Sequence, residues 1–108
     1  MKYRYTTYIG LPIDSIIKLK HCERFISKFN KLNYEKIKTN NYGILYAFKI
    51  GVNEYLEKIN DLSFINKMCR KLTEDEENLL NEIMQELRNE DIISYFYPIN
   101  FTFETLDT

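Results

Sequence analysis

The chain has 108 residues and a formal net charge of −1, with 44% hydrophobic and 29% charged residues. This composition excludes a globally disordered chain, and the length predicts one compact domain over residues 1–108. The near-zero charge hides an asymmetry, because residues 1–50 carry ten Lys/Arg and three Asp/Glu, whereas residues 51–108 carry five Lys/Arg and thirteen Asp/Glu. Such an asymmetry indicates a charged partner or the docking of opposite faces, and it does not indicate a reaction.

The first two predicted elements are a strand and a helix. Residues 3–11 alternate between apolar-leaning and polar side chains, which is typical of a strand. Asp14 or Ser15 can then cap a helix that runs to about Asn30. Apolar residues recur at three- and four-residue spacing along this helix and its end, and they predict its core-facing stripe: Ile16, Leu19, Cys22, Phe25, Ile26, Phe29 and Leu32.

The opposite face of the predicted helix is basic. Lys20, Arg24, Lys28 and Lys31 fall within an arc of roughly 80° when each residue turns by about 100°. Cations in the last turn of a helix are explained by the helix dipole, but Lys20 and Arg24 lie earlier. We therefore predict that these four residues form a partner-binding surface for an acidic protein surface or for phosphates.

A hairpin is predicted next. Residues 34–39 and 43–50 form its strands, and Asn40, Asn41 and Gly43 supply residues that tolerate the turn. The second strand is apolar on one face and partly apolar on the other, which suits a central position in a sheet. Three residues of the strands are candidate contacts on the sheet surface: Arg4, Tyr8 and Lys49.

Two helical regions are predicted to follow. Asn53 opens the first, with a break near residues 60–61. Thr73 and Glu76 form the T-x-x-E pattern of a capping box, which starts a helix to about Asn89. The acids of residues 74–77 suit a first helical turn because they complement the helix dipole. A candidate acidic partner face continues along this helix through Asp75, Glu82 and Glu86.

The last predicted element is a strand over residues 93–106. Pro98 has no amide hydrogen and favours an edge position or a bulge. The element order is therefore strand, helix, strand, strand, helix, helix, strand. This order predicts an α+β domain with a four-stranded, mainly antiparallel sheet and helices packed on one face. A ferredoxin-like topology fits if the two later helices count as one connection.

Two strand motifs resemble those of the RNA recognition motif family. Residues 7–12 read TYIGLP before a helix, and residues 42–48 read YGILYAF. Gly43 and Tyr46 fit the family's third-strand signature, K/R-G-F/Y-G/A-F-V-x-F/Y. The signature is not matched at Tyr42, Ile44, Leu45, Ala47 and Lys49, and residues 53–89 exceed the family's second helix. The resemblance therefore implies a shared architecture, and we carry no base-stacking role across from it.

Residue types for catalysis are scarce. His21 is the only histidine, the three glycines are isolated, and no set of ligands has the spacing of a metal site. We predict no catalytic residues, no metal and no cofactor. Cys22 and Cys69 are predicted to be free thiols, which favours the cytoplasm of the producing or host cell. No apolar stretch is long enough to span a membrane, and the N-terminus lacks the pattern of a signal peptide.

Three functions remain open. We favour a small non-catalytic binding protein that docks on a protein partner as an inhibitor or adaptor. The abundance of Ile, Asn, Lys and Tyr indicates A/T-rich coding DNA, which fits a phage or another mobile element. The second is a nucleic-acid-binding domain that uses the basic first helix. The third is a self-assembling structural protein that pairs through its last strand.

Overall fold

The computed structural model describes residues 1–12, 31–41, 43–89 and 98–107. The predicted first helix, with Lys20, Arg24 and Lys28, lies outside the described residues. So does the first part of the predicted last strand. Within the described ranges, no helix is both long enough and apolar enough to cross a membrane. The described elements form an α+β domain, as the sequence predicts.

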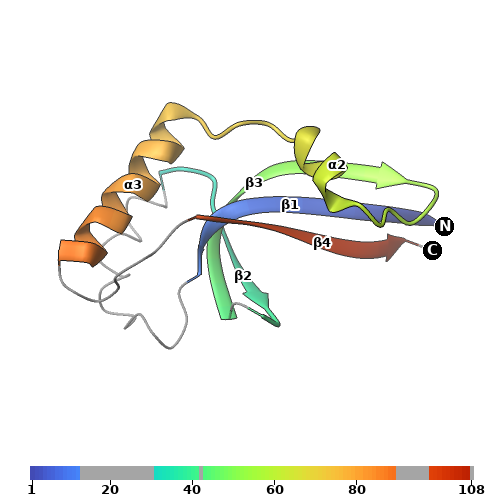
Figure 1. Cartoon of the computed structure of the whole chain (residues 1–108), viewed down its shortest axis with the longest axis horizontal. Coiled ribbons are helices and arrows are strands. Elements are labelled where there is room, and N and C mark those ends of the chain that lie inside the picture. Colours follow the sequence, from blue (N-terminus) through green and yellow to red (C-terminus); the bar gives the residue numbers. More distant parts are fainter. Residues whose placement is uncertain (13–30, 42, 90–97, 108) are drawn as a thin grey trace.

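Four antiparallel strands form one curved sheet. They are β1 (Lys2–Pro12), β2 (Glu35–Thr39), β3 (Gly43–Tyr55) and β4 (Ile99–Asp107), and their order across the sheet is β2-β3-β1-β4. β1, β3 and β4 run side by side along the molecule, and the two ends of the chain lie together (Figure 1). The central place of β3 and the edge place of β4 confirm the sequence predictions.

The turn between β2 and β3 has the predicted chemistry. Gly43 adopts a φ of 67°, in the left-handed region that glycine occupies without steric cost. Thr39 pairs with Gly43 in the sheet, and its Oγ1 donates a hydrogen bond to the Gly43 carbonyl oxygen at 2.8 Å. The polar side chain and the glycine together close the hairpin.

The prediction that a helix opens at Asn53 is wrong. β3 continues to Tyr55, with Asn53 opposite Tyr5 and Tyr55 opposite Tyr3 on β1. The register shifts once, between Thr7 and Tyr8, and the pairing then resumes. The spacing of apolar residues after position 51 suggested a helix. The same spacing also arises where a strand ends and a loop begins, as it does after Tyr55. The hydrogen bonds offered by the long β1 favour the strand.

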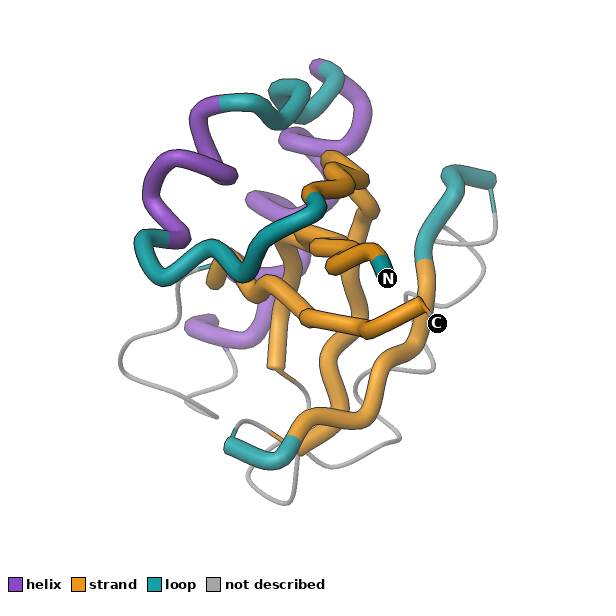
Figure 2. The backbone as a smooth tube through the Cα atoms, turned by 90° about the vertical axis from the view of Figure 1, so that its right-hand side faces the viewer, coloured by secondary structure: helices purple, strands orange, loops and turns teal. Residues whose placement is uncertain are grey.

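The two later helices, which lie in the described part of the chain, are shorter in total than predicted. α2 spans Leu62–Lys67, and Asp61 caps it by accepting hydrogen bonds from the Ser63 backbone N–H at 3.0 Å and the Ser63 hydroxyl at 2.6 Å. These hydrogen bonds lower the pKa of the Asp61 carboxyl. α3 spans Glu74–Asn89. Both described helices lie on the same side of the strands (Figure 2).

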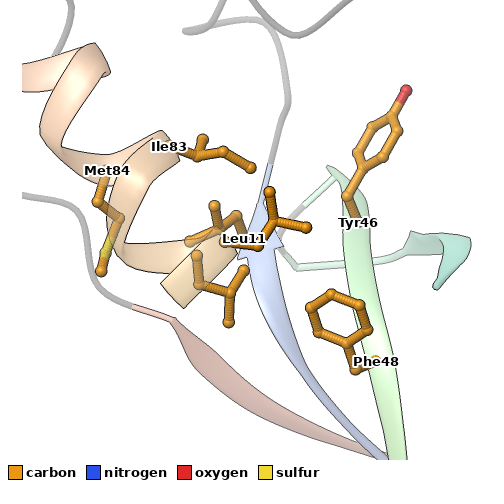
Figure 3. Packing of buried hydrophobic residues seen from close by; sticks show 7 residues of the cluster. Leu11, Tyr46, Phe48, Ile83 and Met84 are labelled. Atoms are coloured by element: carbon orange, nitrogen blue, oxygen red, sulfur yellow. The ribbon is translucent and has the colours of Figure 1, made fainter. Parts of the chain in front are cut away.

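α3 covers one end of the sheet and forms the main hydrophobic cluster. Leu11 of β1 and Phe48 of β3 meet Ile83 and Met84 of α3 (Figure 3). All four side chains are buried, and those of Leu11 and Phe48 are fully buried. The first cluster consists of Leu11, Tyr46, Phe48, Leu79, Leu80, Ile83 and Met84. Leu11 is the residue of β1 in this cluster, so the end of β1 packs against α3.

A second cluster occupies the opposite face of the sheet. Tyr8, Leu45 and Ala47 are buried there, and the partly buried side chains packed against them come from β2 and β4: Ile37, Ile99, Phe101 and Phe103. Among the side chains of α2 and α3 that the structure describes, none belongs to this second cluster. The alternation of β3 therefore divides its side chains between a face covered by described helices and a face where the contacts come from neighbouring strands.

Candidate functional site

Arg70 lies in the segment between the two helices and joins that segment to the sheet. Its backbone N–H donates to the Ile50 carbonyl oxygen at 2.8 Å, and its Nε donates to the Lys49 carbonyl oxygen at 3.1 Å. Its Nη1 and Nη2 donate to the two carboxylate oxygens of Glu76 at 2.7 and 2.9 Å. A bidentate pair of this kind fixes the direction of the guanidinium as well as its position.

Glu76 belongs at once to this ion pair and to the predicted capping box. Its Oε1 accepts the Thr73 backbone N–H at 2.8 Å, while the Glu76 backbone N–H donates to Thr73 Oγ1 at 3.2 Å. The hydrogen bonds from Arg70 lower the pKa of the Glu76 carboxyl, although burial acts in the opposite direction. The capping box is therefore confirmed, and its acid, Glu76, also binds Arg70 in the segment that precedes the helix.

Two separate hollows share Arg70 as a lining residue, and we refer to the two together as the basic groove. The smaller, of about 410 Å³, is lined by Lys31, Leu32, Asn33, Arg70, Thr73 and Glu76. The larger, of about 530 Å³, has Ile9, Ile50 and Leu72 among its apolar lining residues. Its charged lining residues are Lys67, Arg70, Lys71 and Glu77. Volumes of this size are typical of ligand sites.

The basic groove gathers cations from both halves of the sequence. Lys31 is the last of the four residues predicted to form the basic helical face, and its neighbour in the smaller hollow is Arg70 from the acidic half. Four cationic side chains and two acidic ones line the groove as a whole. Lys67, Arg70 and Lys71 were not predicted as site residues. The short spacing of these three cations in the sequence could have indicated a basic site. The segment was instead predicted as part of a helix, in which the three residues would not be expected to line a hollow.

The candidate contacts on the sheet lie on one face, but each of them has partners within the chain. Tyr8 pairs with Lys49 across the strands, and Arg4 lies two alternations away on the same face. The Tyr8 hydroxyl donates to Glu35 Oε2 at 2.9 Å, and Lys49 Nζ lies 3.2 Å from Glu35 Oε1. Arg4 binds the Glu54 carboxylate at 3.0 Å and the Asp107 carboxylate at 2.9 Å.

The Tyr8 ring is not presented as a stacking platform. Only 7% of the residue is exposed, and its ring meets the Phe103 ring edge-on, with centroids 5.9 Å apart. Burial is the main cause that raises the pKa of Tyr8 to about 12, and the hydrogen bond to Glu35 is the second cause. Ile44 and Tyr46 of the motif that resembles the RNA recognition motif pack with the first cluster, beneath α3. The resemblance in sequence therefore does not extend to a row of exposed aromatic rings at these positions.

The candidate acidic face lies along α3. Asp75 and Glu82 are exposed and Glu86 is half-buried. Their spacing of seven and four residues keeps them on one side of the helix. Glu82 and Glu86 also line a shallow hollow of about 430 Å³ with Gln85 and Asn89. In the part of the chain that the structure describes, no three His, Cys, Asp or Glu side chains come together as a metal site.

Cys69 is a free thiol and lies against the sheet. Its Sγ donates to the Ile65 carbonyl oxygen at 3.3 Å. A Cβ atom at Gly51 would lie 2.8 Å from this sulfur, so the glycine allows the segment after α2 to approach β3 closely. Cys22 and His21 lie outside the described residues. The thiol of Cys69 thus has a packing role that explains its position.

Comparisons with models of known protein families, with curated proteins and with solved structures find no match.

Proposed function

We propose that the chain is a non-catalytic binding protein that docks the basic groove, together with the predicted basic face, on an acidic surface of a partner protein. The observation that carries the proposal is the position of Lys31. It lines a hollow with Arg70, and Arg70 in turn lines the hollow that contains Lys67 and Lys71. Cations placed close together steer encounters with an acidic surface and disfavour basic ones.

The proposed role is that of an inhibitor or adaptor in the cytoplasm of the producing or host cell, encoded by a phage or another mobile element. Such a role needs a stable surface rather than a reaction. The hydrogen bonds of Arg70 to β3 and to Glu76 support it, because they hold the wall of the groove in place before a partner arrives.

The experiment is affinity capture from the source cell followed by mass spectrometry, with two charge-reversed variants. The first carries Lys20→Glu, Arg24→Glu and Lys28→Glu. The matched control carries Lys2→Glu, Lys38→Glu and Lys58→Glu, which reverses three exposed lysines outside the groove lining. We expect the first variant to lose partners that the wild type and the control retain. Equal recovery by all three proteins would contradict the proposal.

A nucleic-acid partner is the alternative for the same cations. Binding of this kind depends steeply on salt, because Lys and Arg displace counterions from phosphates. The ratio of absorbance at 260 and 280 nm reports nucleic acid that copurifies with the protein. Binding to oligonucleotides that weakens strongly with salt, and that is lost when Lys20, Arg24 and Lys28 are reversed, would favour this alternative.

Self-assembly has its own supporting observation. β4 lies at the edge of the sheet, so one side of its backbone has no neighbouring strand among the described residues. Edge strands can pair with another chain. Light scattering over a range of protein concentrations tests this function, and a mass that stays monomeric throughout would exclude it.

We infer a ferredoxin-like arrangement for the complete fold. β1 lies between β3 and β4, while β3 lies between β1 and β2, so two strand–connection–strand units interleave. This supports the split β-α-β topology. An experimental structure in which residues 14–30 form a helix on the α3 side would agree with the inference, and a helix on the opposite side would overturn it.

A further inference from the structure

The larger hollow of the basic groove combines an apolar floor with a cationic rim. Ile9 and Ile50 come from the central strands, and Leu72 comes from the segment that leads into α3. Ile50 is buried, whereas Ile9 and Leu72 are partly exposed and can contact a ligand. An aliphatic side chain that covers this floor stabilises the complex, because apolar surface is removed from water. A phosphate group offers no apolar surface for such a contact.

Two lysines that line the hollow are available to bind an anionic group. Lys67 and Lys71 are exposed, and neither forms an ion pair with another of the described residues. Arg70 is already paired with Glu76, so it serves mainly as a wall. Glu77 is the acid on this rim and limits the net charge. The lysine ammonium groups can therefore donate hydrogen bonds to carboxylates, so a matching ligand is negatively charged.

Exposed apolar side chains are concentrated in the segment that runs from the end of β3 through α2. Among the described residues, five of the seven large exposed hydrophobic side chains lie within residues 52–68: Val52, Leu56, Leu62, Phe64 and Met68. Met68 is 61% exposed and stands in the chain between Lys67 and Cys69, which both line the hollow. Met68 is therefore the one of these five side chains that adjoins the lining of the hollow along the chain.

We propose that the larger hollow binds an acidic peptide segment of a partner protein, with an aliphatic side chain on Ile9, Ile50 and Leu72 and flanking carboxylates on Lys67 and Lys71. This inference rests on the proposed function and names the partner chemistry. A single-stranded nucleic acid fits less well, because its bases stack on aromatic rings and no described residue that lines the hollow is aromatic.

The experiment uses the full chain as bait for a phage-displayed library of random short peptides. We expect the selected peptides to combine Leu, Ile or Met with Asp or Glu on both sides. The best peptide is then synthesised with a fluorescent label, and its affinity is measured by anisotropy. A second version replaces its aliphatic residues by serine. We expect this version to bind at least about tenfold more weakly, because it cannot cover the floor.

Two protein variants locate the site. Lys67→Glu with Lys71→Glu is expected to weaken the peptide by at least about tenfold, because like charges then face each other across the contact. Lys36→Glu with Lys38→Glu is the matched control and is expected to bind as the wild type does, because these exposed lysines do not line the hollow and form no ion pair with another described residue. Both variants change exposed side chains, and circular dichroism with thermal melting confirms that each is folded.

Four outcomes overturn the inference. They are the absence of an enriched acidic–aliphatic sequence, equal binding of the serine version, equal binding by the groove variant, and tighter binding of labelled oligothymidine than of the peptide. If these occur while reversal of Lys20, Arg24 and Lys28 still abolishes capture of the partner, the proposed function stands and only the groove assignment fails. If capture is also unaffected, both fail.

Discussion

The two faces of the sheet are stabilised in different ways, although they share the same strands. The first cluster is closed by aliphatic side chains of α3, including Leu80 and Ile83. The second cluster contains a tyrosine whose hydroxyl reaches an exposed carboxylate, and its described contacts come from neighbouring strands. We conclude that the helix-covered face depends on close packing, whereas the other face depends more on cross-strand pairs of rings and polar groups.

The largest expected effect is a cavity on the helix-covered face. Leu80→Ala should lower the free energy of unfolding by about 2–5 kcal/mol, because Leu80 is 1% exposed within the first cluster. Leu62→Ala is the control, since Leu62 is exposed, and its effect should stay within about 0.5 kcal/mol. Urea unfolding monitored by circular dichroism measures both. Similar losses in the two variants would show that α3 is not closely packed.

The next effect tests how closely the segment after α2 approaches the sheet. Gly51→Ala should cost about 1–3 kcal/mol, because the added Cβ meets the Cys69 sulfur. Cys69→Ala removes that sulfur, so the double variant should be more stable than the sum of the two single losses implies. Chemical denaturation of all four proteins completes the cycle. Strictly additive losses would place the strain elsewhere.

The ion pair of Arg70 and Glu76 should give a smaller, pH-dependent effect. Glu76→Gln should cost about 1–2 kcal/mol at neutral pH, a value reduced because Arg70 is 42% exposed. The pKa of Glu76 is lowered in the native state. Its contribution is therefore present above the unfolded-state pKa and is lost as the pH falls through the lowered native value.

Unfolding measured across the acid range should consequently show a flatter pH dependence for Glu76→Gln than for the wild type. Glu74→Gln is the matched control, because Glu74 lies in the same helical turn and is exposed. It leaves the hydrogen bonds between Arg70 and Glu76 in place, so the contribution of that pair should remain. Identical profiles for all three proteins would mean that the Arg70 pair does not contribute to stability.

The smallest effect concerns the opposite face. Tyr8 should ionise near pH 12, because burial and the hydrogen bond to Glu35 raise its pKa. Its contribution to stability is complete below the unfolded-state pKa of about 10 and is lost as the pH rises through the native value. Phenolate absorbance of the wild type minus that of Tyr8→Phe isolates this residue. Glu35→Gln should lower the measured pKa, and an unchanged value would remove Glu35 as a cause.

The sequence predicts those parts of the fold in which one local pattern has one structural solution. The alternation in β1, the glycine of the β2–β3 turn and the T-x-x-E capping box are of this kind, and all three are confirmed. The wrong helix at Asn53 has a physical reason. Apolar residues spaced by three and four also occur where a strand runs into a loop, and only the long-range pairing with β1 decides between them.

The site is less predictable because its residues meet only in three dimensions. Glu76 looks like an acid that complements a helix dipole, and the sequence does not reveal that it also binds Arg70. Lys31 could be assigned to a basic helical face, but its approach to Arg70 depends on how the chain returns to the sheet. Charge counted along the sequence therefore identifies the cations without showing which of them share a groove.

Arg70 also has a consequence for how the molecule opens. One residue binds the carbonyl oxygens of Lys49 and Ile50 on β3 and the carboxylate of Glu76 on α3. The start of α3 cannot separate from β3 while these bonds hold. Amide hydrogen exchange at Arg70 should therefore be as slow as exchange in the first turns of α3, and the two should open as a single cooperative unit.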